Sequence, residues 1–286
     1  MRKGKDVILV TGATGNQGGA LIEQLLRSGH AVVALTRRPA SEQAQALANK
    51  GARVVGGDLN DPASLKKALA GAWGAFAVQN TWEAGVEGEE EQGHRFAELA
   101  KAAGIQHFVY TSVASADRRT GIPHFDNKYR IEDTVRSAGF PSYTIVRPVF
   151  FMENFLGPWF KPGIDQGSLY MAIKPETKLQ MIAVRDIGKY LARAFEQHEK
   201  LKGVELDIAG DELTMPEVAQ VLSEVSGHAV KHVPPPIEEV RKGSADFAAM
   251  LEWFDRVGYD VDIAANTRAY GITPTRFSEW ARMAKW

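Results

Sequence analysis

The chain contains no cysteine among its 286 residues. This absence excludes disulfides, thiolate nucleophiles and cysteine-ligated metal centres together, and it fits a reducing compartment. The chain also lacks an excess of either charge, because 34 basic and 35 acidic residues leave a formal net charge of −1 at pH 7. Without an excess of positive charge there is no field to attract nucleic acid or an anionic membrane, so we expect no direct nucleic-acid binding.

Long apolar runs are absent as well. No stretch of about 18 uncharged apolar residues occurs, and Met1–Lys5 lead into an apolar strand without the hydrophobic region of a secretory signal. The histidines do not show the spacing of zinc motifs, so we predict no metal site. The composition is otherwise that of an ordinary globular protein. We therefore expect a cytoplasmic protein with no membrane span.

The strongest positive signal is a strand, a glycine-rich turn and a helix start near the N-terminus. The apolar run 6–10 is typical of a buried parallel strand, and aliphatic residues at helical spacing follow at 20–26. Between them lies Thr11–Gly18. This arrangement predicts a dinucleotide pyrophosphate at the helix N-terminus. The alternative, a glycine loop that merely connects strand to helix, has less support because both flanks fit.

Each glycine of this loop has its own expected task. Gly12 would allow the tight turn, Gly15 the close approach of backbone to phosphate, and Gly18 the close packing of helix on strand. The predicted pyrophosphate-binding residues are Gly12, Thr14, Gly15, Asn16, Gln17 and Gly18.

Strand and helix patterns then alternate through the first half of the chain. We expect strands at 31–35, 53–55, 73–78, 107–111 and 143–146, with helices between them, among them 41–50 and 89–103. Asp61 should cap a helix that starts at Pro62, and the acidic residues 89–91 should lie at the positive end of their helix. The alternation predicts an α/β fold, a doubly wound parallel Rossmann sheet with ligands at the carboxyl ends of its strands.

The pattern changes after Arg147-Pro148, where proline and glycine pairs interrupt shorter elements. A helix expected at 183–195 and a strand at 204–208 still fit the sheet. We therefore expect a Rossmann domain of residues 1–150 and about 181–209, and a smaller, discontinuous C-terminal region of residues 151–180 and 210–286. Aromatic residues of that region are compatible with a lid, a homodimer face or ordinary packing, and packing is the simplest; they are Phe247, Trp253, Phe254, Trp280 and Trp286.

Residues after the second and third strands bear on the choice between NAD and NADP. An acidic residue after the second strand would bind the ribose 2′-hydroxyl and repel a 2′-phosphate, but Arg37 and Arg38 stand there. Two guanidinium groups favour NADP(H) over NAD(H), because each can bind phosphate oxygens through two N–H groups. The alternative is two solvated loop arginines. After the third strand, we assign Asp58 and Leu59 to the cofactor site; Asp58 is compatible with binding the adenine amino group or with a loop or cap role.

Polar and aromatic residues follow three further strands. Those after the fourth and sixth strands should flank the nicotinamide, because both groups leave carboxyl strand ends; they are Gln79, Asn80, Trp82, Pro148, Phe150 and Phe151. Ser112, at the end of the fifth strand, is compatible with binding a substrate carbonyl or with a merely polar strand end. The aromatic residues suit either an apolar wall for a substrate or core packing.

Several of these segments together resemble the NmrA-like family of atypical short-chain dehydrogenases. The segments are Thr11–Gly18, Thr36–Arg38, Gly57–Leu59, Val146–Phe155, 184–188 and 213–219. Met152–Phe155 is the more family-specific signature, and its Asn154 is assigned to the substrate side together with Trp82, Ser112 and Phe150. The resemblance covers nearly the whole chain. It implies a Rossmann domain with a small substrate-side domain, NAD(P) binding, and either redox sensing through a protein partner or reduction of quinones and related substrates.

The residues that would carry chemistry depart from the usual short-chain dehydrogenase pattern. In that pattern a tyrosine and a lysine stand four residues apart on one helical face, and the lysine lowers the tyrosine pKa and holds the ribose. Here Lys128 matches the lysine, and His124 stands in the tyrosine position. An imidazole can deliver a proton at neutral pH. His124 and Lys128 are therefore the candidate catalytic residues; the alternatives are a cap or loop role for His124 and a solvated helix position for Lys128.

Two nearby tyrosines do not restore the pattern. A literal Tyr-x-x-x-Lys motif occurs at Tyr170–Lys174, but in a strand-like stretch, where the two side chains would not share a helical face. Tyr129 neighbours Lys128 and would face about 100° away from it on a helix.

Two functions are compatible with these residues. In the first, an NADPH-dependent reductase transfers hydride to a quinone or small carbonyl compound, with His124, Lys128 or water supplying the proton. A quinone can take its proton from solvent, so loss of the tyrosine costs less there. In the second, the site senses the nucleotide and a regulatory protein partner reads its state. We favour the reductase, with a small-molecule acceptor as its partner.

Overall fold

The computed structural model describes residues 6–286; Met1–Lys5, where we expected no secretory signal, lie outside the described residues. The chain divides into two compact units. Unit 1 contains the residues up to Ala116, His124–Arg147 and Ile187–Leu206, and unit 2 contains Asp117–Pro123, Pro148–Asp186 and Asp207–Trp286. This division counts residues 117–123, 148–150, 181–186 and 207–209 with unit 2, whereas the sequence pattern grouped them with the Rossmann domain.

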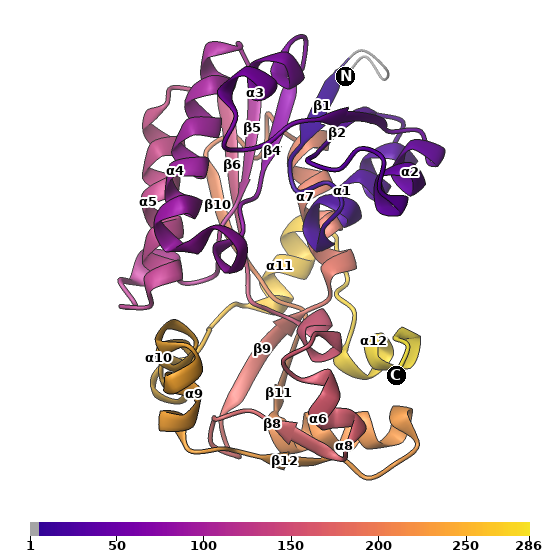
Figure 1. Cartoon of the computed structure of the whole chain (residues 1–286), viewed down its shortest axis with the longest axis vertical. Helices are drawn as coiled ribbons and strands as arrows, with labels where there is room; N and C mark the ends of the chain where they lie inside the picture. The colour runs from indigo at the N-terminus through magenta and orange to yellow at the C-terminus, as the bar shows by residue number, and fades with distance from the viewer. Residues whose placement is uncertain (1–5) are drawn as a thin grey trace. The chain divides into compact units, whose positions relative to one another are not determined.

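Unit 1 is built on a seven-stranded sheet of order β10-β6-β5-β4-β1-β2-β3 (Figure 1). The strand pairs from β3 to β6 are all parallel. The expected doubly wound α/β fold is thereby confirmed. The strands are β1 (Val7–Val10), β2 (Ala31–Thr36), β3 (Arg53–Gly56), β4 (Gly74–Ala77), β5 (His107–Thr111), β6 (Ser142–Pro148) and β10 (Val204–Ile208).

Helices cover both faces of this sheet (Figure 1). They are α1 (Asn16–Arg27), α2 (Glu42–Asn49), α3 (Pro62–Leu69), α4 (Thr81–Ala102), α5 (Pro123–Ser137) and α7 (Val184–Glu196), with a short 3-10 turn, η1, at Ala116–Arg118. The apolar sides of α3, α4 and α5 form one core with the strands, which includes Leu65, Phe96 and Ile131. Helices α1 and α7 approach closely, since a Cβ on Gly188 would lie 2.7 Å from the Ala20 carbonyl oxygen.

The strand order reverses between β1 and β4, because β1 pairs with β2 on one side and β4 on the other. Parallel sheets bind their ligands at such a switch point, outside the carboxyl ends of the strands. Two hydrogen bonds join the segment after β1 to the segment after β4. Thr11 Oγ1 donates to the Val78 carbonyl at 3.2 Å and accepts from the Val78 amide at 2.9 Å.

Helix α4 begins earlier than the sequence indicated. Asn80 caps it by accepting a hydrogen bond from the Trp82 amide, and Gly85 interrupts it with a φ of 74°. Two helical segments thus meet at Gly85, and the acidic residues 89–91 lie in the first turns of the second segment, near the positive end where we expected them. The expected start of α3 is confirmed, with Asp61 as N-cap and Pro62 in the first turn.

Unit 2 contains a three-stranded sheet of order β11-β9-β7 and a two-stranded pair of β12 and β8. Its strands are β7 (Phe150–Phe151), β8 (Ser168–Tyr170), β9 (Lys178–Ile182), β11 (Asp211–Thr214) and β12 (Lys231–Val233). Its helices are η2 (Met152–Leu156), α6 (Lys161–Asp165), α8 (Met215–Ser226), α9 (Ile237–Gly243), α10 (Ala245–Arg256), α11 (Ile263–Tyr270) and α12 (Phe277–Met283).

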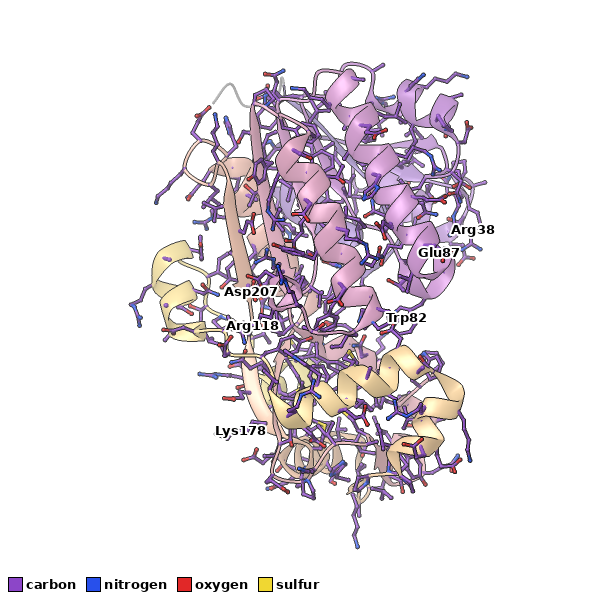
Figure 2. All side chains as sticks on the ribbon, turned by 90° about the vertical axis from the view of Figure 1, so that its left-hand side faces the viewer. Arg38, Trp82, Glu87, Arg118, Lys178 and Asp207 are labelled. Atoms are coloured by element: carbon purple, nitrogen blue, oxygen red, sulfur yellow. The ribbon has the colours of Figure 1, made fainter. Side chains whose placement is uncertain are left out.

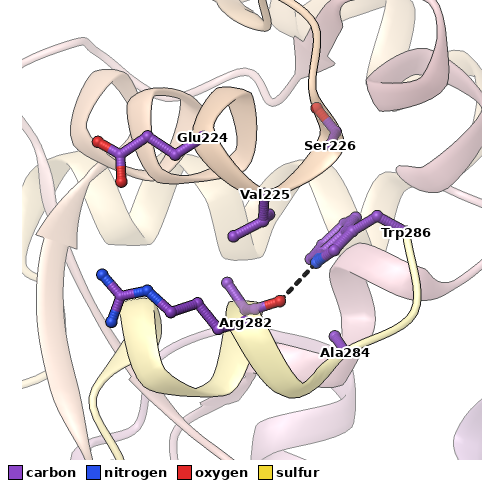
Figure 3. A pocket seen from close by; sticks show the side chains of 7 residues that line it. Glu224, Val225, Ser226, Arg282, Ala284 and Trp286 are labelled. Atoms are coloured by element: carbon purple, nitrogen blue, oxygen red, sulfur yellow. Dashed lines mark hydrogen bonds between the residues drawn. The ribbon is translucent and has the colours of Figure 1, made fainter.

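The aromatic residues near the C-terminal end mostly pack inside unit 2. Trp253, Phe254 and Trp280 are buried, and Phe247 stacks on the exposed Trp159 with ring centroids 6.4 Å apart. Trp286 donates its indole N–H to the Ala281 carbonyl at 2.7 Å. A pocket of about 360 Å³ opens beside it, lined also by Glu224, Val225, Ser226, Arg282 and Ala284 (Figure 3).

Within residues 6–286, no helix combines the length and the apolar character that a membrane crossing requires.

Candidate functional site

The glycine loop after β1 has the conformation that only glycine accepts readily. Gly12 has a φ of +56°, and a Cβ there would lie 2.5 Å from Val78 Cγ1. A Cβ on Gly18 would lie 2.3 Å from the Gly12 carbonyl oxygen, because the first turn of α1 packs directly on the loop. The geometry therefore gives Gly12 the tight turn, and Gly18 the close packing, that the sequence predicts.

The N-terminus of α1 carries no side-chain cap. Gly15 is its N-cap in extended conformation and supplies no side-chain oxygen to the first amides. An uncapped helix N-terminus is a position where anions bind. Thr14 and Asn16 are exposed there, whereas Gln17 accepts a hydrogen bond from Thr111 Oγ1 at 2.7 Å and so links α1 to the end of β5.

The two arginines after β2 have different surroundings. Arg37 donates to Glu83 Oε2 at 2.6 Å, and both side chains are exposed. Arg38 is exposed, as is Glu87 of α4 (Figure 2). Arg37 is thus held by a carboxylate from the first turn of α4. This pair could not be predicted from the sequence, because its members are separated by 46 positions.

Asp58 closes a local turn after β3. Its Oδ1 accepts from the Asn60 amide at 2.8 Å, and its own amide donates to Ser64 Oγ at 3.1 Å. Leu59 is partly buried against the core. The loop role that the sequence left open for Asp58 is present in the structure, while its contact with adenine stays a prediction.

Two buried polar side chains stand at the carboxyl ends of β4 and β5. Gln79 is 5% exposed and Ser112 is 4% exposed. Within the described part of the chain, the Gln79 amide oxygen and nitrogen and the Ser112 hydroxyl have no hydrogen-bond partner. Buried polar atoms are nearly always paired, with protein, water or a ligand. These three atoms are therefore available to water or to a polar ligand at this end of the sheet.

Helix α5 presents both candidate catalytic residues. His124 is buried in the first turn, with ring centroids 5.5 Å from Trp82 and 4.8 Å from Phe125. It is therefore a helix residue that packs against the segment after β4. Trp82 itself is 60% exposed and leaves part of its ring open to a further apolar contact.

Lys128 is not a solvated helix residue. Its side chain is 14% exposed, and its Nζ donates to Glu89 Oε1 at 2.6 Å. Glu89 is fully buried and also accepts hydrogen bonds from Asn127 Nδ2 and Thr81 Oγ1. The sequence did not reveal Glu89 as the partner of Lys128, because the two residues lie 39 positions apart.

A second buried ion network fixes the far half of α5. Arg147 binds Glu132 through two hydrogen bonds of 2.8 and 2.6 Å, and also donates to Glu205 at 2.6 Å. Arg136 joins both carboxylates, and its hydrogen bond is the main reason why the pKa of Glu205 is lowered. Bidentate arginine pairs of this kind set both distance and orientation, so α5 is held firmly to β6 and β10.

The predicted site residues of unit 2 lie in and beside β7. Phe150 is buried, with ring centroids 5.7 Å from Phe155 and 6.2 Å from Phe160, so its ring is part of an aromatic core. Phe151 and Asn154 are half-buried, and Pro148 is buried. The cofactor role of Pro148 and Phe151 and the substrate role of Phe150 and Asn154 stay predictions.

The family signature in unit 2 has a structural task. The Glu153 carboxylate accepts from the Val184 amide at the start of α7 at 2.9 Å and from the Trp280 indole at 3.0 Å. Burial raises the pKa of Glu153, while these hydrogen bonds oppose the rise. The carboxylate therefore ties η2 to the first residue of α7 and to the middle of α12.

The two tyrosines that we set aside lie apart from this chemistry. Tyr170 ends β8 and Lys174 lies in the turn beyond it, so the predicted absence of a shared helical face is confirmed. The Tyr129 ring faces the Arg136 guanidinium at 4.9 Å. Among residues 6–286, no group of three or more His, Asp or Glu side chains is placed to hold a metal ion.

The strand order, the glycine turn and the uncapped helix define a protein with a Rossmann-type dinucleotide-binding fold. More narrowly, the chain belongs to the NmrA-like family, whose sequence model matches residues 4–281.

Relatives of this chain include named oxidoreductases. It is 29% identical over 259 residues to the NmrA-like family domain-containing oxidoreductase malD of Malbranchea aurantiaca, covering 82% of this chain and 76% of that protein. It is 30% identical over 252 residues to quinone oxidoreductase 2 of Escherichia coli, covering 86% and 81%. A crystal structure of the NADPH-dependent quinone oxidoreductase QOR2 of Escherichia coli, complexed with NADPH, matches with a TM-score of 0.83 at 26% identity, covering 96% of this chain and 99% of that one.

Proposed function

We propose that the protein is an NADPH-dependent oxidoreductase that reduces a quinone or a small carbonyl compound. One observation carries the proposal: hydrogen bonds and a ring contact join the glycine turn to the candidate catalytic helix through a single chain segment. Thr11 bonds Val78 at the end of β4, and four residues later Trp82 packs on His124 of α5. The glycine turn, to which we assign phosphate binding, and His124, to which we assign proton donation, are thus connected through the segment at the carboxyl end of β4. The oxidoreductase names of the relatives support this choice.

A nicotinamide dinucleotide fits the residues of unit 1. The tight turn at Gly12 and the uncapped start of α1 suit a pyrophosphate. The Gln79 amide and the Ser112 hydroxyl, which are buried and unpaired among the described residues, suit a ligand with hydrogen-bonding groups. The loop residues Thr14–Asn16 would hold the pyrophosphate, and Lys128 would hold the nicotinamide ribose.

The preference for NADP(H) rests on Arg37 and Arg38. No acidic residue follows β2 to bind the ribose 2′-hydroxyl, and guanidinium groups bind phosphate oxygens well. Arg37 already binds the Glu83 carboxylate, so a 2′-phosphate would exchange one anion for another. Glu83 would therefore compete with the 2′-phosphate for the Arg37 guanidinium. Arg37 would be the residue that discriminates between NADP(H) and NAD(H).

The chain's own residues would supply binding, orientation and a proton. When bound, NADPH supplies the hydride. An imidazole nitrogen of His124 would donate the proton to the reduced oxygen of the acceptor, and the exposed part of Trp82 offers an apolar surface for a planar ring beside it. A quinone suits this site because its reduced form also takes protons from water.

Turnover with a panel of acceptors tests the proposal. Purified protein is mixed with NADPH and with quinones or aldehydes, and nucleotide loss is followed by absorbance. We expect one or more quinones to accelerate NADPH loss, and His124→Phe to slow a carbonyl acceptor more than a quinone. The matched control is Glu91→Gln, an exposed position of α4 that pairs only with Arg95 in the described structure. NADPH binding without acceleration by any acceptor would contradict the proposal and would instead fit a nucleotide sensor.

A further inference from the structure

We propose that Glu89 is a positioning residue of the site, whose buried carboxylate fixes the Lys128 ammonium and ties the segment after β4 to α5. The inference rests on the proposed function, in which Lys128 holds the nicotinamide ribose. No sequence motif points to Glu89. The two oxygens of its carboxylate make the contacts from which we infer this role.

Both oxygens of Glu89 are engaged, although the side chain is fully buried. Oε1 accepts from Lys128 Nζ at 2.6 Å, while Oε2 accepts from Asn127 Nδ2 at 2.8 Å and from Thr81 Oγ1. A buried carboxylate is costly unless it is paired and hydrogen-bonded. Its partners come from the first residue of α4 and from two adjacent positions of α5, so the carboxylate joins three points of unit 1.

The packing of the two helices explains why Glu89 can reach α5. One turn further along each helix, Gly93 of α4 faces Ile131 of α5, and a Cβ on Gly93 would lie 2.6 Å from Ile131 Cδ1. The missing side chain lets the helices approach closely there. Glu89 and Asn127, one turn earlier on the same two helices, are thereby brought within hydrogen-bond distance.

The pair should remain together when a ligand binds. A lysine side chain has many rotamers, and if ligand binding had to fix one of them, the lost conformational entropy would weaken the affinity. If Lys128 turned away, the buried carboxylate would keep only two uncharged donors. Lys128 therefore stays on Glu89 and offers its two remaining N–H groups in an arrangement that exists before the ligand arrives.

The same carboxylate also orders the segment that carries Gln79 and Trp82. Thr81, which donates to Glu89 Oε2, stands between them in the sequence. Glu89 thus fixes the position of Lys128 relative to the unpaired Gln79 amide and to the Trp82 ring beside His124. A single buried side chain sets the spacing of the groups that would surround the nicotinamide.

A double-mutant cycle tests the inference. NADPH affinity is measured for wild type, Glu89→Gln, Lys128→Met and the double variant, and urea unfolding verifies that each is folded. We expect Glu89→Gln to weaken NADPH binding roughly tenfold, the effect of losing one charge-assisted hydrogen bond. In the Lys128→Met background, Glu89→Gln should have a much smaller effect than in wild type, because the larger part of its effect passes through the lysine and only the contact with Thr81 remains to order the segment after β4. Additive losses would show a merely structural role and overturn the inference.

The matched control is Glu132→Gln. Glu132 is a fully buried carboxylate of α5 that binds Arg147 rather than Lys128. The Glu132→Gln variant should have a lower free energy of unfolding than wild type and the same NADPH affinity. A Glu132→Gln loss of affinity as large as that of Glu89→Gln would contradict a specific role for Glu89.

A measurement without nucleotide separates this inference from the proposed function. The rate of Lys128 acetylation by a small activated ester, read by mass spectrometry, should rise in Glu89→Gln, because the amine loses its carboxylate partner. If the wild-type protein binds no NADPH, the proposed function is wrong. The role of Glu89 and Lys128 in NADPH binding is then wrong as well. If wild type binds NADPH while Glu89→Gln changes neither affinity nor acetylation, the proposed function stands and Glu89 is not a positioning residue.

Discussion

A buried histidine makes the stability of unit 1 depend on pH. His107, the first residue of β5, is fully buried near Trp73, and its Nδ1 shares a hydrogen bond of 2.9 Å with Ser142 Oγ. Burial, followed by the neighbouring His198, lowers the pKa of His107 from 6.5 to about 3, against a smaller opposing effect of the Ala194 backbone. The native protein therefore keeps this imidazole neutral where the unfolded chain would protonate it.

The sign and size of the effect follow from linkage. Above the unfolded pKa of 6.5 both states are neutral, and the full stability is present. Between pH 6.5 and the folded value of about 3, the unfolded chain binds the extra proton, so the free energy of unfolding falls as the pH falls. At about 1.4 kcal/mol per pH unit, His107 alone should remove about 2 kcal/mol between neutral pH and about pH 5.

Urea unfolding of wild type and His107→Phe at several pH values measures this contribution. The phenyl ring keeps an aromatic group beside Trp73 and cannot protonate. We expect the variant to lose stability less steeply than wild type from about pH 6.5 to pH 5, with a difference in slope near that of one proton. Other titrating groups are common to both proteins and cancel in the comparison. Equal slopes would refute the assignment of a strongly lowered pKa to His107.

Three further predictions concern the site in unit 1. Gly18→Ala should destabilise the fold by about 1–3 kcal/mol and weaken NADPH binding, because its Cβ would overlap the Gly12 carbonyl; an unchanged melting temperature would contradict the tight packing. Arg37→Ala should weaken NADPH binding far more than NADH binding, and Glu83→Gln should strengthen only NADPH binding. Equal changes for both nucleotides in binding titrations would refute a competition between Glu83 and the 2′-phosphate for Arg37. Gln79→Leu should raise the melting temperature of the free protein yet weaken NADPH binding, since it removes an unpaired buried amide that a ligand would use; a stabilised protein with unchanged affinity would contradict that use.

The parallel sheet was predictable because its signals are local. Val7–Val10 is a continuous apolar run with glycines directly after it, and Asp61-Pro62 marks a helix start within two residues. Such patterns report hydrophobic periodicity and capping, which act over a few positions. The sequence pattern located the part of α4 after the break at Gly85 but not the short helical segment that begins at Thr81.

The partners of the site residues could not be predicted in the same way. Lys128 and Arg37 were identified from their positions in the chain, but Glu89 and Glu83 meet them only because α4 packs beside α5 and its first turn reaches the segment after β2. An acidic residue in a helix pattern is usually solvated. Nothing local distinguishes the fully buried Glu89 from the exposed Glu91 two positions later.

The most direct test of the central claim is the stoichiometry of catalytic turnover. The protein, at a concentration far below that of NADPH and a quinone acceptor, should consume NADPH over many turnovers and form one equivalent of hydroquinone for each nucleotide oxidised, faster than with NADH. Saturable NADPH binding with no oxidation above the protein-free rate, for any quinone or carbonyl acceptor, would contradict the account.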